Sequence, residues 1–113
     1  MIWGGSRARV YIYPEACDMR RSFGSLSGMV REQLLQDPLS GHYFFFMNKA
    51  KNYVKLLCWD GSGYILTAKK LPQGCFSKPL SKELLLQELV SILEHPQTST
   101  SRSKGKRCRF IPD

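Results

Sequence analysis

Hydrophobic residues between positions 37 and 71 fall into three short runs that polar segments separate. The runs cover Tyr43–Met47, Tyr53–Trp59 and Tyr64–Ala68. The two connections, Asn48–Asn52 and Asp60–Gly63, have the length and the Asn, Asp and Gly content of hairpin turns. The pattern therefore predicts a meander of three antiparallel strands.

An earlier strand and a helix are expected before this meander. Arg9–Tyr13 is rich in β-branched and aromatic residues and predicts a strand that Pro14 ends. A helix is then expected from Asp18, its N-cap, to about Gln36. Its apolar residues recur every three or four positions, at Met19, Phe23, Leu26, Val30 and Leu34. Glycines at positions 24 and 28 weaken this helix or allow it to approach the sheet closely.

A second helix is expected to start after Ser81 and to end near Pro96. One face of this helix carries Leu84, Leu85, Leu89 and Ile92. Residues 97–113 are polar, basic and rich in Ser and Thr, which predicts a disordered tail. The order β-α-β-β-β-α indicates a small single α+β domain over residues 1–96, with the meander packed by one main helix.

The charge distribution favours a polyanionic partner. The formal net charge is +8, and residues 97–113 hold five Lys and Arg against one Asp, while residues 1–96 hold twelve against eight Asp and Glu. A basic surface with a basic tail favours phosphate backbones through counterion release. Solubility alone is the alternative explanation of such charge.

The sequence gives no support for a bound cofactor or for a membrane-spanning segment. The four cysteines, at positions 17, 58, 75 and 108, show no C-x-x-C spacing, so no metal or other cofactor is expected. No apolar run approaches the roughly 20 residues that span a bilayer. Because no signal peptide is evident either, we expect a cytoplasmic protein whose cysteines are reduced.

Catalysis is not expected. Neither a phosphate-binding loop nor a nucleophile-elbow motif is present. A cysteine and a histidine that are distant in the sequence could form a catalytic pair in the folded chain, but nothing in the sequence supports such a pair. Nine carboxylates are few for metal-dependent phosphoryl chemistry. Asp18, Asp37 and Asp60 are better explained as residues that start helices, end them or form turns. A nuclease would instead show cleavage that depends on a divalent ion and on Asp18 or Asp60.

Several cations and one tryptophan are candidates for nucleic-acid contact. Arg20 and Arg21 are expected in the first turn of the helix, where they face an anion or pair with Asp18 or Glu15. Trp59 either stacks on a base or packs on the core. The remaining candidates are lysines and arginines that either bind phosphates or form a solvated rim. They are Lys49, Lys51, Lys55, Lys69 and Lys70, with Arg102, Lys104, Lys106, Arg107 and Arg109 in the tail.

Several motifs in this order carry a family resemblance. They are DMRRSFGSL at residues 18–26, DPLSGH at 37–42, VKLLCWDG at 54–61 and AKKL at 68–71, followed by Gly74 and Phe76. The chain resembles the TnpB-type accessory protein, the second open reading frame product, of the insertion sequence sixty-six family of bacterial transposable elements. The similarity covers roughly residues 9–76. Cys58 stands where family members often have tryptophan.

The resemblance implies a non-catalytic protein that assists DNA transposition by binding element DNA, the transposase of the same element, or both. An alternative is a protein interaction module that docks on the transposase without contacting DNA. If the basic tail contributes to DNA binding, removing residues 97–113 should flatten the dependence of affinity on salt. The oligomeric state stays open.

Overall fold

The computed structural model describes residues 8–96, which form a five-stranded sheet and two helices. The elements are β1 (Arg9–Ala16), α1 (Phe23–Glu32), β2 (Tyr43–Met47), β3 (Tyr53–Trp59), β4 (Tyr64–Lys70), β5 (Glu83–Leu85) and α2 (Leu86–Glu94). The strand order is β4-β3-β2-β1-β5. The strands β2, β3 and β4 pair antiparallel, which confirms the predicted meander and the small α+β class. The strand β1 lies parallel to β2, and α1 connects the two.

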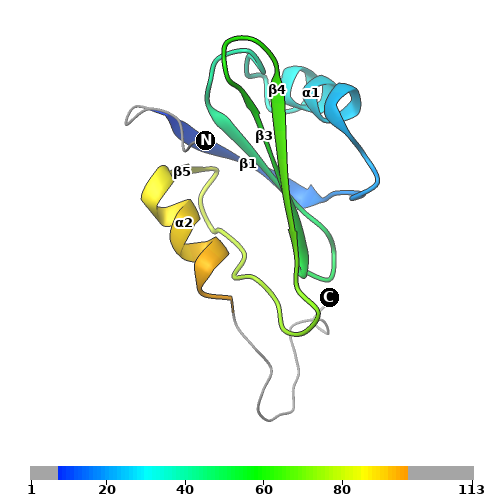
Figure 1. Cartoon of the computed structure of the whole chain (residues 1–113), viewed down its shortest axis with the longest axis vertical. Coiled ribbons are helices and arrows are strands. Elements are labelled where there is room, and N and C mark those ends of the chain that lie inside the picture. Colours follow the sequence, from blue (N-terminus) through cyan, green and yellow to red (C-terminus); the bar gives the residue numbers. More distant parts are fainter. Residues whose placement is uncertain (1–7, 97–113) are drawn as a thin grey trace.

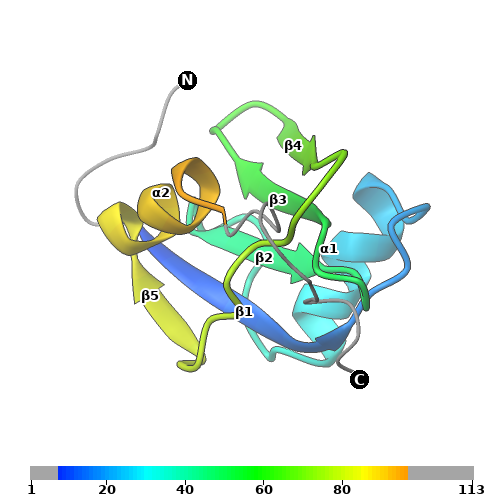
Figure 2. The same cartoon turned by 90° about the horizontal axis from the view of Figure 1, so that it is seen from below.

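The two helices lie on opposite sides of the sheet (Figures 1 and 2). Side chains alternate across β2, so Phe44 and Phe46 join the cluster beneath α1 while Tyr43, Phe45 and Met47 join the larger cluster on the α2 side. All five residues of β2 are buried, as expected of a central strand that is covered on both faces. The sheet therefore separates two cores, and a single predicted main helix accounts for only one of them.

Strand β1 continues past Pro14 to Ala16, so the prediction that Pro14 ends it is wrong. The pairing of β1 with β2 shifts in register between Ile12 and Ala16. On the other side, β5 pairs with Arg9–Tyr11. Pro14 lies beyond that pairing and within the irregular stretch, where a missing N–H is tolerated.

Helix α1 begins at Phe23, after the N-cap Ser22, and not at Asp18. Asp18 closes a turn instead, because its carbonyl accepts the Arg21 N–H at 3.1 Å and its carboxylate accepts the Arg20 N–H at 2.9 Å. Both arginines therefore precede the helix and do not form its first turn. Apart from its chain neighbours and the backbone of its own helix, a Cβ added at position 24 or 28 would meet no heavy atom within 4 Å, so neither glycine serves close packing on the sheet.

The short strand β5 was not predicted, because its leucines fit the apolar stripe of the expected second helix. Instead, Leu84 pairs with Val10 of β1, and helix α2 starts only at Leu86. The Leu85 N–H is capped by the carboxylate of Glu88 at 2.8 Å. Pairing with β1 thus overrides the helical pattern for three residues.

The described cysteines are all buried, but they differ in redox state. Cys17 and Cys58 are free thiols, as expected, whereas Cys75 is disulfide-bonded, so the expectation of reduced cysteines is wrong there. Burial raises the pKa of both free thiols. Among residues 8–96 no helix is long and apolar enough to cross a membrane. The predicted tail, residues 97–113, lies outside the described residues.

Candidate nucleic-acid interface

Two lysines lie beside the Tyr53 ring on the sheet face that α1 covers, and the backbone of Arg21 contacts one of them. The amino group of Lys70 lies 5.4 Å from the centre of the Tyr53 ring, and that of Lys55 lies 5.9 Å from it. Tyr53 and Lys70 are direct partners across β3 and β4, and Lys55 is two residues along the same face. Lys55 also donates to the Arg21 carbonyl at 2.9 Å. We call Arg21, Tyr53, Lys55 and Lys70 the Tyr53 cluster.

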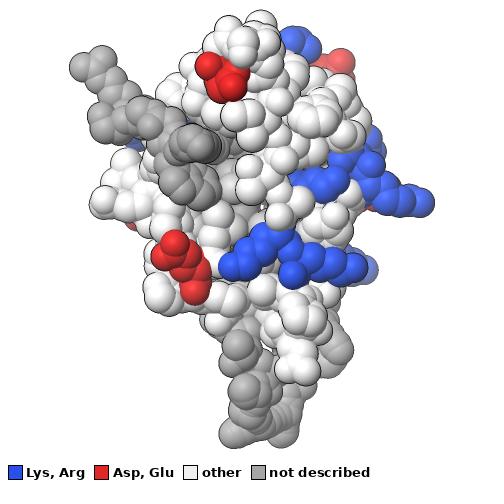
Figure 3. Space-filling view, viewed as in Figure 1, with Lys and Arg blue, Asp and Glu red and all other residues white. Residues whose placement is uncertain are grey.

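The Tyr53 cluster keeps most of its donors available to solvent. The Lys70 and Arg21 side chains are exposed, and Lys55 is half-buried. The guanidinium of Arg21 donates to the Ser25 hydroxyl at 2.6 Å, a neutral partner that leaves its charge uncompensated. Within residues 8–96 no carboxylate forms an ion pair with these three cations. Figure 3 shows Lys and Arg gathered along one side of this view, near the end of β4 and the segment before α1.

Arg20 is committed to an ion pair. Its guanidinium lies 2.8 Å from the carboxylate of Asp18, although the arginine side chain is 90% exposed. The hydrogen bonds from Arg20 lower the pKa of Asp18 to about 2. The pairing alternative that the sequence left open for Arg20 is therefore present, and its charge is largely balanced.

Lys69 has a structural role on the other face. Because neighbouring residues of a strand point to opposite sides, Lys69 faces α2 while Lys70 faces Tyr53. The Lys69 amino group donates to the carbonyl of Leu93 at 2.8 Å. A cation there satisfies a free carbonyl in the last turn of α2 and complements the helix dipole.

Trp59 lies at the far end of β3 from Tyr53. Its ring packs edge-on against Tyr64, with ring centres 5.1 Å apart, and is half-buried. Six residues of extended strand separate Trp59 from Tyr53 by about 20 Å. The structure thus gives Trp59 a packing partner and does not bring it into the Tyr53 cluster.

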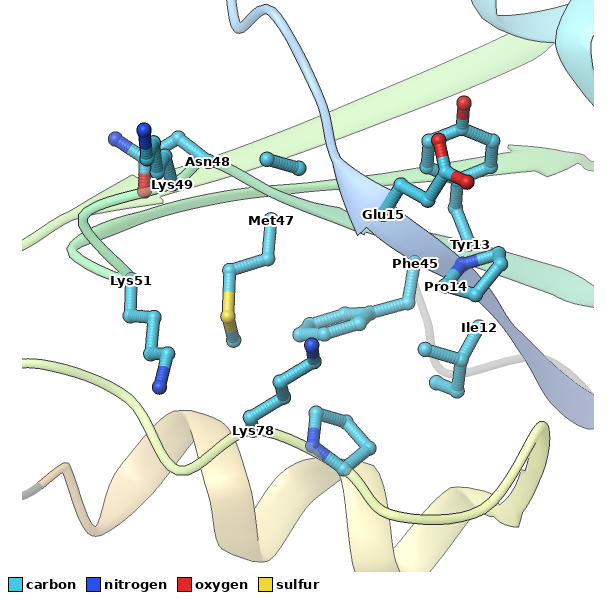
Figure 4. Close-up of a pocket in the computed structure, with 12 residues that line it drawn as sticks. Ile12, Tyr13, Pro14, Glu15, Phe45, Met47, Asn48, Lys49, Lys51 and Lys78 are labelled. Carbon is cyan, nitrogen blue, oxygen red and sulfur yellow. The ribbon is translucent and has the colours of Figure 1, made fainter. Parts of the chain in front are cut away.

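Lys49 and Lys51 lie in the β2–β3 turn and line a pocket on the α2 side of the sheet. They are joined there by Lys78, which sequence reasoning did not single out (Figure 4). Tyr53 was also missed, although the strand pairing that follows from the Asp60–Gly63 turn places it opposite Lys70. The tail candidates at positions 102, 104, 106, 107 and 109 lie outside the described residues.

The aspartates have structural roles. The carboxylate of Asp60 accepts the N–H groups of Ser62 at 2.9 Å and Gly63 at 3.0 Å, which lowers its pKa. That of Asp37 accepts the Leu39 N–H at 2.9 Å. In the described part of the chain no three His, Cys, Asp or Glu side chains come together as a metal site would require.

A family comparison agrees with the order of motifs in the sequence. The model of the IS66 Orf2-like protein family matches residues 8–99. The chain belongs to the IS66 Orf2-like family. It is thereby a protein associated with transposition in an accessory role.

Two curated relatives come from Sinorhizobium fredii, and both are uncharacterized. The protein y4jC is 37% identical over 83 residues, which cover 74% of this chain and 71% of the relative. The protein y4hO is 37% identical over 79 residues, which cover 70% and 69%. No solved structure matches the chain.

Proposed function

We propose that this protein is a non-catalytic accessory factor of transposition that binds the DNA of its element through the Tyr53 cluster. Arg21, Lys55 and Lys70 would contact phosphates, and Tyr53 would contact sugar or base edges. The observation that carries this proposal is the pair of lysines beside one aromatic ring, with Arg21 joined to Lys55 through its carbonyl; none of these three cations has a carboxylate partner among residues 8–96.

The arrangement favours contact with a phosphate backbone. The cations come from two strands and from the loop before α1, so that together they form a surface and not a closed cavity. Lysine amino groups act as point charges that tolerate many positions of a phosphate. Such contacts position DNA without reading its sequence, so we expect modest preference between duplexes from this cluster alone.

The first test is fluorescence anisotropy of the full-length chain with labelled duplexes, one carrying an element end and one scrambled. The double variant Lys55→Gln/Lys70→Gln removes two charges. Lys82→Gln, at an exposed lysine beside β5, removes one charge and is the control for charge outside the cluster. Each phosphate contact contributes about 0.9 to the slope of log affinity against log salt, so the double variant should reduce the slope by about 2.

An unchanged slope in the double variant, together with a normal circular dichroism spectrum, would contradict the proposal. A loss of about 0.9 in the slope in Lys82→Gln, half of that in the double variant, would show that overall charge matters and not the cluster. The tail remains a separate prediction: removing residues 97–113 should flatten the salt dependence further, independently of the double variant.

Docking on a protein of the same element, above all its transposase, is a second candidate function. The observation in its favour is the lysine-lined pocket on the α2 side, which offers an apolar surface that phosphates do not use. Binding of purified transposase to this chain without DNA, unaffected by Lys55→Gln/Lys70→Gln, would support this function.

A further inference from the structure

The pocket on the α2 side of the sheet has an apolar floor. It encloses about 290 Å³, and Ile12, Phe45 and Met47 form its base. Figure 4 shows these side chains extending from β1 and β2 toward the segment that carries Lys78. Small-ligand sites usually measure about 300–1,000 Å³, so this pocket suits one or two side chains more than a large ligand.

The rim of the pocket is basic. Lys49 and Lys51 enter from the β2–β3 turn and Lys78 from the opposite wall, against the single carboxylate of Glu15. In Figure 4, Lys51 and Lys78 extend into the space beside Met47, while Glu15 points away from it. An apolar floor beneath excess positive charge complements an apolar side chain that is flanked by carboxylates.

The turn that carries two of these lysines is held in one conformation. The Asn48 side chain accepts the N–H groups of Asn52 and Tyr53, both at 3.1 Å, and donates to the Asn52 side chain at 2.8 Å. Lys51 has a φ of 63°, which is costly for a residue with a side chain. Its carbonyl accepts the Phe76 N–H at 2.7 Å, which fixes the turn to the opposite wall.

Such a fixed turn reduces the ordering cost of binding, because the lysines already border the pocket before a ligand arrives. Strained residues persist where the surrounding structure determines them and often belong to binding sites. The conformation of Lys51 is thus part of what holds this turn, and its lysines, at the border of the pocket.

The neighbouring strand edge favours a peptide as that ligand. Strand β5 pairs with Arg9–Tyr11, and no other described strand pairs with Tyr13–Ala16 on that side. Exposed backbone groups at a strand edge match the backbone of an extended peptide. Pro14 supplies a carbonyl but no N–H, so the contact should be short and not a full ladder.

We propose that this pocket binds an apolar side chain carried by an acidic peptide segment of a protein partner. The pocket and the Tyr53 cluster lie on opposite faces of the sheet, since Phe45 belongs to the core on the α2 side and Leu57, between Lys55 and Trp59, to the core beneath α1. A protein partner in the pocket would therefore leave the Tyr53 cluster open.

The test starts with selection of a phage-displayed library of random peptides on the full-length chain, followed by anisotropy titration of the enriched peptides after labelling. Ala16→Phe should fill the pocket from an exposed position. Ala16 pairs with Met47, so its side chain points to the α2 side. Ala68→Phe, also at an exposed strand position but paired with Lys55, is the matched control on the opposite face.

We expect enriched peptides that combine Asp or Glu with an aromatic or aliphatic residue. Their affinity should fall about tenfold in Ala16→Phe and severalfold in Lys78→Glu, and should be unchanged in Ala68→Phe and Lys82→Glu. Resonance shifts of Met47 and Lys51 amides on titration would place the peptide in the pocket.

Three outcomes would overturn the proposal. The first is a lack of enrichment, and the second is enrichment of peptides without acidic residues. The third is equal binding by Ala16→Phe and the unaltered chain, provided that the variant retains the native circular dichroism spectrum. If Ala16→Phe instead weakens binding of a labelled oligothymidine and not of peptides, the pocket is a nucleic-acid subsite and the peptide proposal fails.

Discussion

The two faces of the sheet both present lysines, but the surroundings of those lysines differ. On the α1 side, Lys55 and Lys70 lie beside the Tyr53 ring at an open surface. On the α2 side, Lys51 and Lys78 border a pocket whose floor is apolar. Positive charge is present on both faces, so charge alone does not identify the partner of either face.

The difference shows how neighbouring groups select among anionic partners. A lysine on an open surface next to an aromatic edge suits a phosphate chain, because both the charge and the ring stay accessible. A lysine at the mouth of an apolar pocket suits a ligand that brings a carboxylate together with a hydrophobic group. If both proposals hold, the two faces of one small sheet would bind two classes of partner without competition between them.

The largest expected effect comes from removing a buried aromatic ring from one or the other of the two cores, which lie on opposite faces of the sheet. Phe45→Ala removes the floor of the pocket, and Phe46→Ala removes an equally buried ring on the α1 side. Each should lower the free energy of unfolding by about 3–5 kcal/mol, measured by urea denaturation. Of the two variants, Phe45→Ala alone should also abolish peptide binding to the pocket.

A loss of that size can unfold a domain of this length. The milder pair Phe45→Leu and Phe46→Leu keeps the comparison measurable, since each retains most of the buried volume. If Phe46→Leu weakens peptide binding as much as Phe45→Leu does, the two faces are not independent.

A crossed experiment tests whether the two faces of the sheet bind their ligands independently. Ala16→Phe should weaken pocket peptides about tenfold and leave the affinity for duplex DNA unchanged. The double variant Lys55→Gln/Lys70→Gln should weaken DNA binding about tenfold at moderate salt and leave peptide affinity unchanged. Anisotropy titrations of both ligands with both variants measure the four affinities. A loss in either crossed combination would indicate one shared site.

The meander could be predicted because its information is local. The two polar connections fix the hairpins, and the hairpins fix which residues face each other, so that Tyr53 opposite Lys70 was within reach of the sequence. The short strand β5 was not, since Leu84 satisfies a helical stripe equally well until Val10 of β1 is beside it. Pairing with a strand that is distant in the sequence determines whether such a segment forms a helix or a strand.

The residues of the candidate site also divide into those whose contacts the local sequence predicts and those whose contacts it does not. The sequence correctly offered a salt bridge for Arg20, because Asp18 is two residues away. It could not show that Lys69 caps α2 or that Lys78 lines the same pocket as Lys51, because these residues belong to segments that only the folded chain brings together. Trp59 and Tyr53 belong to one strand, yet strand length alone separates their environments.

A smaller effect concerns the outer surface of α1. Gly28→Ala should raise the free energy of unfolding by about 1 kcal/mol, because a methyl group there meets no heavy atom of another element within 4 Å and alanine favours the helix. Gly41→Ala is the contrasting variant, since its φ of 91° disfavours a side chain, and should be destabilising. Thermal unfolding followed by circular dichroism distinguishes the two. Destabilisation by Gly28→Ala would show packing on this face that the structure lacks.

The smallest effect is a pH dependence that originates next to the Tyr53 cluster. The carboxylate of Asp18 holds Arg20 in an ion pair. This pair balances the charge of Arg20, so that Arg20 adds little to the positive charge of Arg21, Lys55 and Lys70. The pKa of Asp18 in the folded chain is about 2, below the value of about 3.9 for an unpaired aspartate. The unfolded state therefore takes up this proton first as the solution is acidified.

Stabilisation by this pair should be fully present above about pH 4 and should disappear as the pH falls toward 2. Asp18→Asn should accordingly lower the thermal unfolding midpoint at pH 6 and have less effect near pH 2, as measured by circular dichroism across that range. Glu32→Gln, an exposed carboxylate outside the described ion pairs, should change neither limit. At neutral pH, Asp18→Asn should also strengthen DNA binding slightly, because Arg20 then joins the cations of the α1 side. Weaker binding would mean that Asp18 serves the interface by ordering the loop that carries Arg21.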